Sequence, residues 1–146
     1  MLIKQISVFL ENSQGRLALV TKVLAENNID IRAISIADTT DFGIMRLIVS
    51  DPDKAYSALK TAGYTVSQTE VLGAKIDDKA GALADMLDIL VNHDMSVEYI
   101  YVFVAKNDRD AFVIMKINDE GKPVSAAKLL SDNGITVLNG EDINNI

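Results

Sequence analysis

The stretch Gly15-Arg16-Leu17-Ala18 returns 66 positions later as Gly81-Ala82-Leu83-Ala84, and this repeat decides the fold. The shift later grows to 71, where Gly63 matches Gly134 and Pro52 matches Pro123. A chain that repeats its pattern in this way contains two copies of one structural unit. Apolar residues keep the same spacing between the copies; the matched pairs are Val20 and Met86, Val23 and Ile89, Leu24 and Leu90, Ile29 and Met95, Ile31 and Val97, and Ile34 and Ile100.

Each copy predicts the order strand, helix, strand, strand, helix, strand. Alternation of apolar and polar residues predicts the first strand, and apolar residues on one face predict the helix after Gly15. The second helix is expected to begin at Asp51-Pro52, because Asp caps free amides and Pro suits a first turn, and to end at Gly63. In the first copy, strands are expected over 3–10, 31–37, 43–50 and 64–71, and helices over 16–27 and 52–63.

The second copy predicts the same elements and completes the fold class. We expect an α+β protein made of two ferredoxin-like βαββαβ units, each an antiparallel four-stranded sheet with two helices on one face. No linker rich in Pro, Gly or Ser separates the copies, so the expected domains are residues 1–71 and 72–146. The elements of the second copy are strands over 70–76, 97–104, 110–118 and 135–140, and helices over 82–92 and 123–133.

The open faces of the two predicted sheets differ in polarity. In the first copy this face can be polar, with Gln5, Ser7, Arg32 and Ser35. In the second copy, residues 97–104 are apolar on both sides of a strand, a pattern typical of burial on both faces. We therefore expect the open face of the second copy to be covered, by the first copy or by a second chain.

Composition excludes several classes of function. The chain has 146 residues, 49% of them hydrophobic, and a net charge of −7, which disfavours binding to nucleic acid and to anionic membranes. It has no Cys and one His, so thiolate catalysis and multi-histidine metal sites are excluded. No nucleophile–base pair, phosphate-binding glycine motif or membrane-spanning apolar run is present. We expect a cytoplasmic protein that is not an enzyme and uses no cofactor or metal.

The loop before the first helix of each copy resembles the ligand loop of ACT domains. In the first copy this segment is Glu-Asn-Ser-Gln-Gly-Arg-Leu at 11–17, followed by Asn-Asn-Ile-Asp-Ile at 27–31; the second copy, with 77–83 and 94–97, fits more loosely. The whole chain is similar to the small tandem ACT proteins that lack a catalytic domain. The resemblance implies an allosteric, homodimeric regulator that binds a small amino acid at an interface between units. The alternative is a regulatory subunit of a biosynthetic enzyme such as acetolactate synthase.

The resemblance also implies where the ligand binds. It would lie between the loop after the first strand and the start of the second strand of a neighbouring unit. Positions three before and fifteen after the loop glycine are frequent contacts; the later position is often Asn in the family but is Asp30 and Ser96 here. The expected ligand-binding residues are Asn12, Ser13, Gln14, Gly15, Arg16, Leu17 and Asp30 in the first copy, and Asp78, Lys79, Ala80, Gly81, Ala82, Leu83 and Ser96 in the second.

The chemistry of these residues suits a zwitterion. Amides at a helix start attract a carboxylate, and Asn12 or Asp30 can accept from an ammonium group. The first copy has the better-equipped loop, and the acidic Asp30 and Asp78 favour a polar or basic amino acid over a branched-chain one. The alternative interpretation is that each loop is only a strand-to-helix turn, and that the acidic pairs at 77–78 and 141–142 belong to an ordinary acidic surface.

Overall fold

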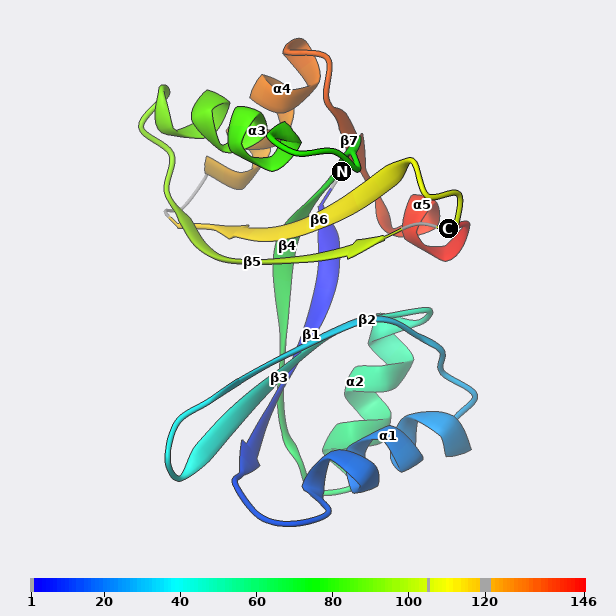
Figure 1. Cartoon of the computed structure of the whole chain (residues 1–146). Helices are drawn as coiled ribbons and strands as arrows, with labels where there is room; N and C mark the ends of the chain where they lie inside the picture. Colours follow the sequence, from blue (N-terminus) through cyan, green and yellow to red (C-terminus); the bar gives the residue numbers. More distant parts are fainter. Residues whose placement is uncertain (1, 105, 119–121) are drawn as a thin grey trace. The chain divides into compact units, whose positions relative to one another are not determined.

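A computed structural model describes residues 2–104, 106–118 and 122–146 (Figure 1). The chain forms two compact units, one of Lys4–Thr69 and one of Glu70–Ile146 together with the residues up to Ile3. None of the helices in the described ranges is long and apolar enough to cross a membrane. The domain boundary expected between residues 71 and 72 stays a prediction.

The first unit has the βαββαβ order expected from the sequence. Its sheet has the order β2-β3-β1-β4, and β3 pairs antiparallel with both β1 and β2. Both helices lie on one face of this sheet (Figure 1). The elements are β1 (Ile3–Glu11), α1 (Arg16–Glu26), β2 (Ile31–Asp38), β3 (Phe42–Val49), α2 (Pro52–Thr61) and β4 (Thr65–Asp77).

The core of the first unit follows from two sequence periods. Alternate residues of β1 point to the helices, since side chains of a strand alternate between faces. Val20 and Leu24, one helical turn apart on α1, are fully buried against them, as is Leu59 of α2. Figure 1 shows this sheet with α1 and α2 beside it.

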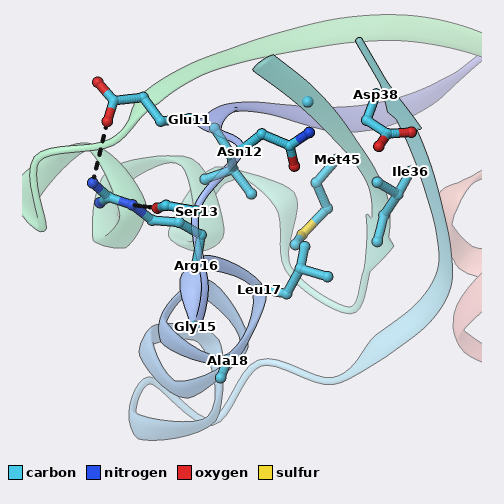
Figure 2. Close-up of a pocket in the computed structure, with 12 residues that line it drawn as sticks. Glu11, Asn12, Ser13, Gly15, Arg16, Leu17, Ala18, Ile36, Asp38 and Met45 are labelled. Carbon is cyan, nitrogen blue, oxygen red and sulfur yellow. Dashed lines mark hydrogen bonds and ion pairs between the residues drawn. The ribbon is translucent and has the colours of Figure 1, made fainter. Parts of the chain in front are cut away.

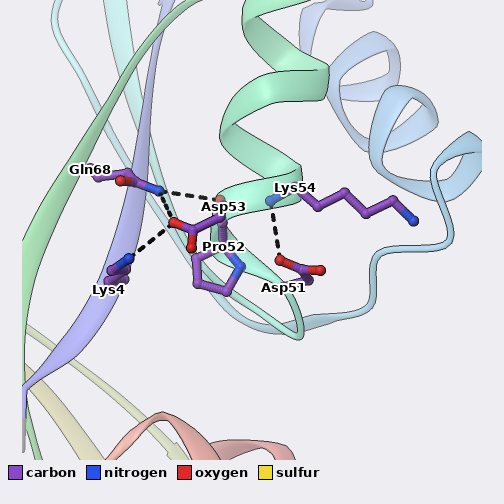
Figure 3. A network of polar contacts seen from close by, with 6 residues as sticks. All are labelled: Lys4, Asp51, Pro52, Asp53, Lys54 and Gln68. Carbon is purple, nitrogen blue, oxygen red and sulfur yellow. Dashed lines mark hydrogen bonds and ion pairs between the residues drawn. The ribbon is translucent and has the colours of Figure 1, made fainter.

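The start of α2 is fixed by the residues that predicted it. Asp51 accepts a hydrogen bond from the backbone amide of Lys54 at 3.1 Å, and Pro52 is the first helical residue. Beside this cap, Asp53 Oδ1 accepts hydrogen bonds from Gln68 Nε2 at 2.9 Å and from Lys4 Nζ at 3.0 Å (Figure 3). These contacts tie α2 to β4 and β1.

The Asp53 contacts predict an acid-dependent contribution to stability. The hydrogen bond from Gln68, followed by the bond and charge of Lys4, lowers the pKa of Asp53 below 3.8. A lowered pKa stabilises the folded state above the unfolded pKa, and this stabilisation is lost as the pH falls through the folded pKa. Asp53→Asn should therefore destabilise the protein near neutral pH and have no effect in strong acid, as measured by urea unfolding across this pH range. Asp41→Asn, on an exposed hairpin away from the network, should show no such pH dependence; equal behaviour of the two variants would contradict the assignment.

The second unit repeats the topology of the first. Its sheet has the order β7-β4-β6-β5, and β6 pairs antiparallel with β4 and β5. The strands expected at 64–71 and 70–76 are one continuous 13-residue strand, β4. At Gly73, a Cβ would displace the end of the Ile3 side chain and press on Leu138 Cβ, so glycine allows the closest packing at this position. The further elements are α3 (Ala82–Val91), β5 (Val97–Val104), β6 (Asp110–Ile117), α4 (Lys122–Asp132) and β7 (Thr136–Leu138).

A short helix, α5 (Gly140–Asn144), was not expected. The strand predicted over 135–140 ends at Leu138 instead. Asn139 accepts a hydrogen bond from the Asp142 amide at 2.9 Å, and Asp142 Oδ2 accepts one from the Asn139 amide at 2.8 Å. This reciprocal capping box ends the strand and begins α5, which buries Ile143.

Two expectations about the sheet faces need correction. We expected the strand over 97–104 to be buried on both faces. Within a single chain this prediction is wrong, because Val102 and Val104 are 47% and 60% exposed. β5 is the edge strand, and the strand buried on both faces is its neighbour β6. Conversely, the polar Gln5 and Ser7 of the first unit are buried, and Gln5 Nε2 donates to Ser7 Oγ at 3.3 Å.

Candidate functional site

A cavity of about 460 Å³ opens in the first unit beside the loop that joins β1 to α1 (Figure 2). The loop, the first turn of α1 and the paired ends of β2 and β3 form its walls. The lining residues are Leu10, Glu11, Asn12, Ser13, Gly15, Arg16, Leu17, Ala18, Ile36, Asp38, Gly43 and Met45.

The loop is held in place by hydrogen bonds to backbone carbonyls of the β2–β3 hairpin. The amide of Asn12 donates to the carbonyl of Asp41 at 2.9 Å, and Asn12 Nδ2 donates to the carbonyl of Thr39 at 3.0 Å. One of the two N–H donors of Asn12 Nδ2 is thereby used, and Oδ1 stays available to accept from a ligand. The hairpin thus fixes both the loop and the orientation of Asn12.

The start of α1 carries amides without a side-chain cap. Gly15 has φ 84°, a left-handed conformation that glycine adopts without strain. Because glycine has no side chain, it does not cap the first amides of the helix. No acidic residue lies in the first turn either. Within the described part of the chain, the amides of Leu17 and Ala18 have no backbone acceptor. Such amides and the positive end of the helix dipole attract an anion.

Arg16 is engaged within the loop. Its Nε donates to Ser13 Oγ at 3.0 Å, and its guanidinium lies 3.5 Å from the Glu11 carboxylate. Figure 2 shows Arg16 turned toward Glu11, on the opposite side from Ile36 and Met45. Gln14, which the sequence also predicted, is not a lining residue.

Asp38 is the carboxylate that the prediction from sequence missed. It ends β2, lines the cavity, and has no ion pair or hydrogen bond from its side chain among the described residues. Ile36 and Met45 also line the cavity and were not predicted. The pairing of Asp38 with Gly43 and of Glu11 with Phe42 brings these strand ends to the loop. A predicted register for the sheet could have found them.

Asp30 is not part of this cavity. It precedes β2, whereas the cavity lies at the other end of that strand, and α1, about 16 Å long, separates the loop from it. Asp30 Oδ2 lies 3.3 Å from Arg32 Nη1, and the Asp30 amide donates to Ser50 Oγ. Within one unit, the structure does not bring Asp30 to Asn12.

The loop of the second unit has the same backbone hydrogen bonds. Gly81 has φ 91°, Asp78 donates its amide to the carbonyl of Arg109 at 2.8 Å, and the amide of Lys79 donates to the carbonyl of Asp77. Ala80, Ala82 and Leu83 complete the turn, and Ser96 precedes β5 as Asp30 precedes β2. The first turn of α3 differs, because it holds the acidic Asp85, which disfavours an anion there.

Comparison with known proteins agrees with this architecture. The family model of the ACT domain pair matches residues 1–122. A crystal structure of a protein from Bacteroides thetaiotaomicron is similar, with 39% identity, a TM-score of 0.92, and coverage of 100% of this chain and 98% of that chain. The regulatory subunit of aspartate kinase from Thermus thermophilus is similar in fold, with 16% identity, a TM-score of 0.66, and coverage of 88% and 91%.

No curated protein matches the sequence significantly. The family match extends over most of the chain, from β1 through β6, and includes both glycine loops. The chain therefore belongs to the family of ACT domain pairs.

Proposed function

We propose that this protein is a regulatory sensor that binds a free α-amino acid in the cavity of its first unit. The uncapped start of α1 would receive the carboxylate, and Asp38 with Asn12 Oδ1 would receive the ammonium group. One observation carries this proposal: the same cavity holds free helix amides, which attract an anion, and an unpaired carboxylate, which attracts a cation. ACT domains are regulatory modules, and we propose no catalysis by the chain itself.

The proposed site includes a second copy of the chain. β2 is an edge of the first unit's sheet, and its Ile34 and Ile36 are each 46% exposed. Exposed apolar edges tend to pair with another strand. If two β2 strands pair antiparallel about a twofold axis, the start of one lies beside the end of the other. Asp30 of the partner subunit would then approach the Asp38 end of the cavity. We accordingly propose a homodimer, with the loop at 78–83 and Ser96 as a weaker second site.

A catalytic partner is the second candidate. Phe9 and Phe42, on the face of the first sheet away from its helices, are 47% and 62% exposed. Exposed aromatic residues of this kind are common at protein interfaces. A regulatory subunit of an amino-acid biosynthetic enzyme, such as acetolactate synthase, would use such a surface in the cytoplasm. Purification of the tagged chain from its native cell separates the candidates, because a subunit brings a large catalytic chain with it.

A thermal-shift and calorimetry screen against the twenty amino acids tests the sensor proposal. A bound amino acid at a hundredfold excess over its Kd should stabilise the folded protein by about 2.7 kcal/mol. The amide and the N-acetyl form of the best ligand serve as controls, since each removes one charge of the zwitterion and should bind far more weakly. Equal binding of these derivatives, or no binding by any amino acid, would rule out the proposed site.

A further inference from the structure

Three apolar side chains line the side of the cavity away from Arg16. Leu17 comes from the first turn of α1, Ile36 from β2 and Met45 from β3 (Figure 2). Met45 is fully buried, but Leu17 and Ile36 remain 45% and 46% exposed. Apolar surface left open beside polar groups that converge on one point is typical of a ligand pocket.

The charged groups of the cavity leave no partner for a charged ligand side chain. Asp38 is used by the ammonium group in the proposed pose, and Glu11 is paired with Arg16 at 3.5 Å. The expectation of a polar or basic ligand depended on Asp30 and Asp78. Asp30 is paired with Arg32 at 3.3 Å, and the partner's Asp30 would approach the cavity with this ion pair already made. A basic side chain in this cavity would therefore lose hydration without gaining a carboxylate that is free of another cation.

We propose that the ligand is an amino acid with an aliphatic side chain, of the size of valine, leucine, isoleucine or methionine, which Leu17 and Ile36 contact. This inference rests on the proposed sensor function and replaces the preference for a polar or basic ligand. Ile36 is the contact that a substitution tests best, because it can be changed without opening the buried core, whereas Met45 cannot.

The test compares the affinities of leucine, lysine, serine and glycine by calorimetry, with NMR titration for the weak ligands. Leucine should bind at least about tenfold more tightly than glycine, which has the same charges and no side chain. Tighter binding of lysine or serine would overturn the aliphatic assignment and leave the sensor function standing. Binding by none of the aliphatic or polar amino acids would overturn both.

Two matched variants locate the contact. Ile36→Ser should lower the ratio of leucine affinity to glycine affinity about tenfold. Ile34→Ser changes a residue on the same strand and face with the same exposure, but outside the cavity. It therefore controls for any effect on β2 pairing, and its ratio of leucine to glycine affinity should stay at the wild-type value. An equal fall of this ratio in the two variants, or an unchanged ratio in Ile36→Ser, would overturn the assignment of Ile36 to the ligand side chain.

Discussion

Gly15→Val should abolish amino-acid binding and lower the free energy of unfolding by about 1–2 kcal/mol, the cost of a left-handed conformation for a residue with a Cβ. The backbone at Gly15 has φ 84°, and no atom lies within 4 Å of the position of a Cβ, so the cost comes from the backbone and not from a collision. Relief of this strain should turn the amides of Leu17 and Ala18 away from the cavity. Calorimetry measures the binding, and urea unfolding measures the stability.

Gly81→Val is the matched control, because the second unit offers the same conformation. Gly81 has φ 91° and equally open surroundings, so the loss of stability should be similar. Binding should persist, since the start of α3 carries Asp85 and the proposed main site is in the first unit. Loss of binding in Gly81→Val with retention in Gly15→Val would show that the wrong unit had been chosen.

The repeated elements could be predicted because their signals are local. An alternating strand, an apolar helix face, the Asp51-Pro52 start and the left-handed glycines each act over a few residues, and the structure confirms them. The helix α5 also has a local signal, the capping box of Asn139 and Asp142, but the strand pattern that precedes it obscured the signal.

Burial was harder to predict, because it depends on which strand lies at an edge. Residues 97–104 have the composition of a central strand, yet β5 is at the edge and exposes Val102 and Val104. Gln5 and Ser7 look like surface residues, yet both are buried and joined by a hydrogen bond. Composition alone does not give strand order, so neither the exposure of β5 nor the burial of Gln5 and Ser7 could be predicted from these segments.

The candidate site could be predicted in part for the same reason. The loop residues adjacent to Gly15 are consecutive, and most of them line the cavity. Ile36, Asp38 and Met45 reach it only because β2, β3 and β1 pair in one register, which joins residues far apart in the sequence. The role of Asp30 depends on a neighbouring unit and stays a prediction.

Asp38→Asn should weaken amino-acid binding about 10- to 100-fold, because a hydrogen bond to a charged group contributes about 1.5–3 kcal/mol. The substitution keeps the shape of the side chain and removes its charge, and Asp38 has no partner among the described residues whose loss would unfold the loop. The free energy of unfolding without ligand should therefore stay close to that of the wild type. Calorimetry with the best ligand measures the affinity of both proteins.

Asp41→Asn removes the same charge from the same hairpin, but its side chain does not line the cavity, so its affinity should stay close to the wild-type value. This control separates a contact with the ammonium group from a general effect of negative charge, which would weaken both variants equally. A methyl ester of the ligand, which keeps the ammonium group, should lose affinity by the same factor in the wild type and in Asp38→Asn, since the carboxylate contact is the same in both proteins and they differ only at the ammonium contact. An unchanged affinity in Asp38→Asn would place the ammonium group elsewhere and would leave the helix amides as the remaining part of the proposed site.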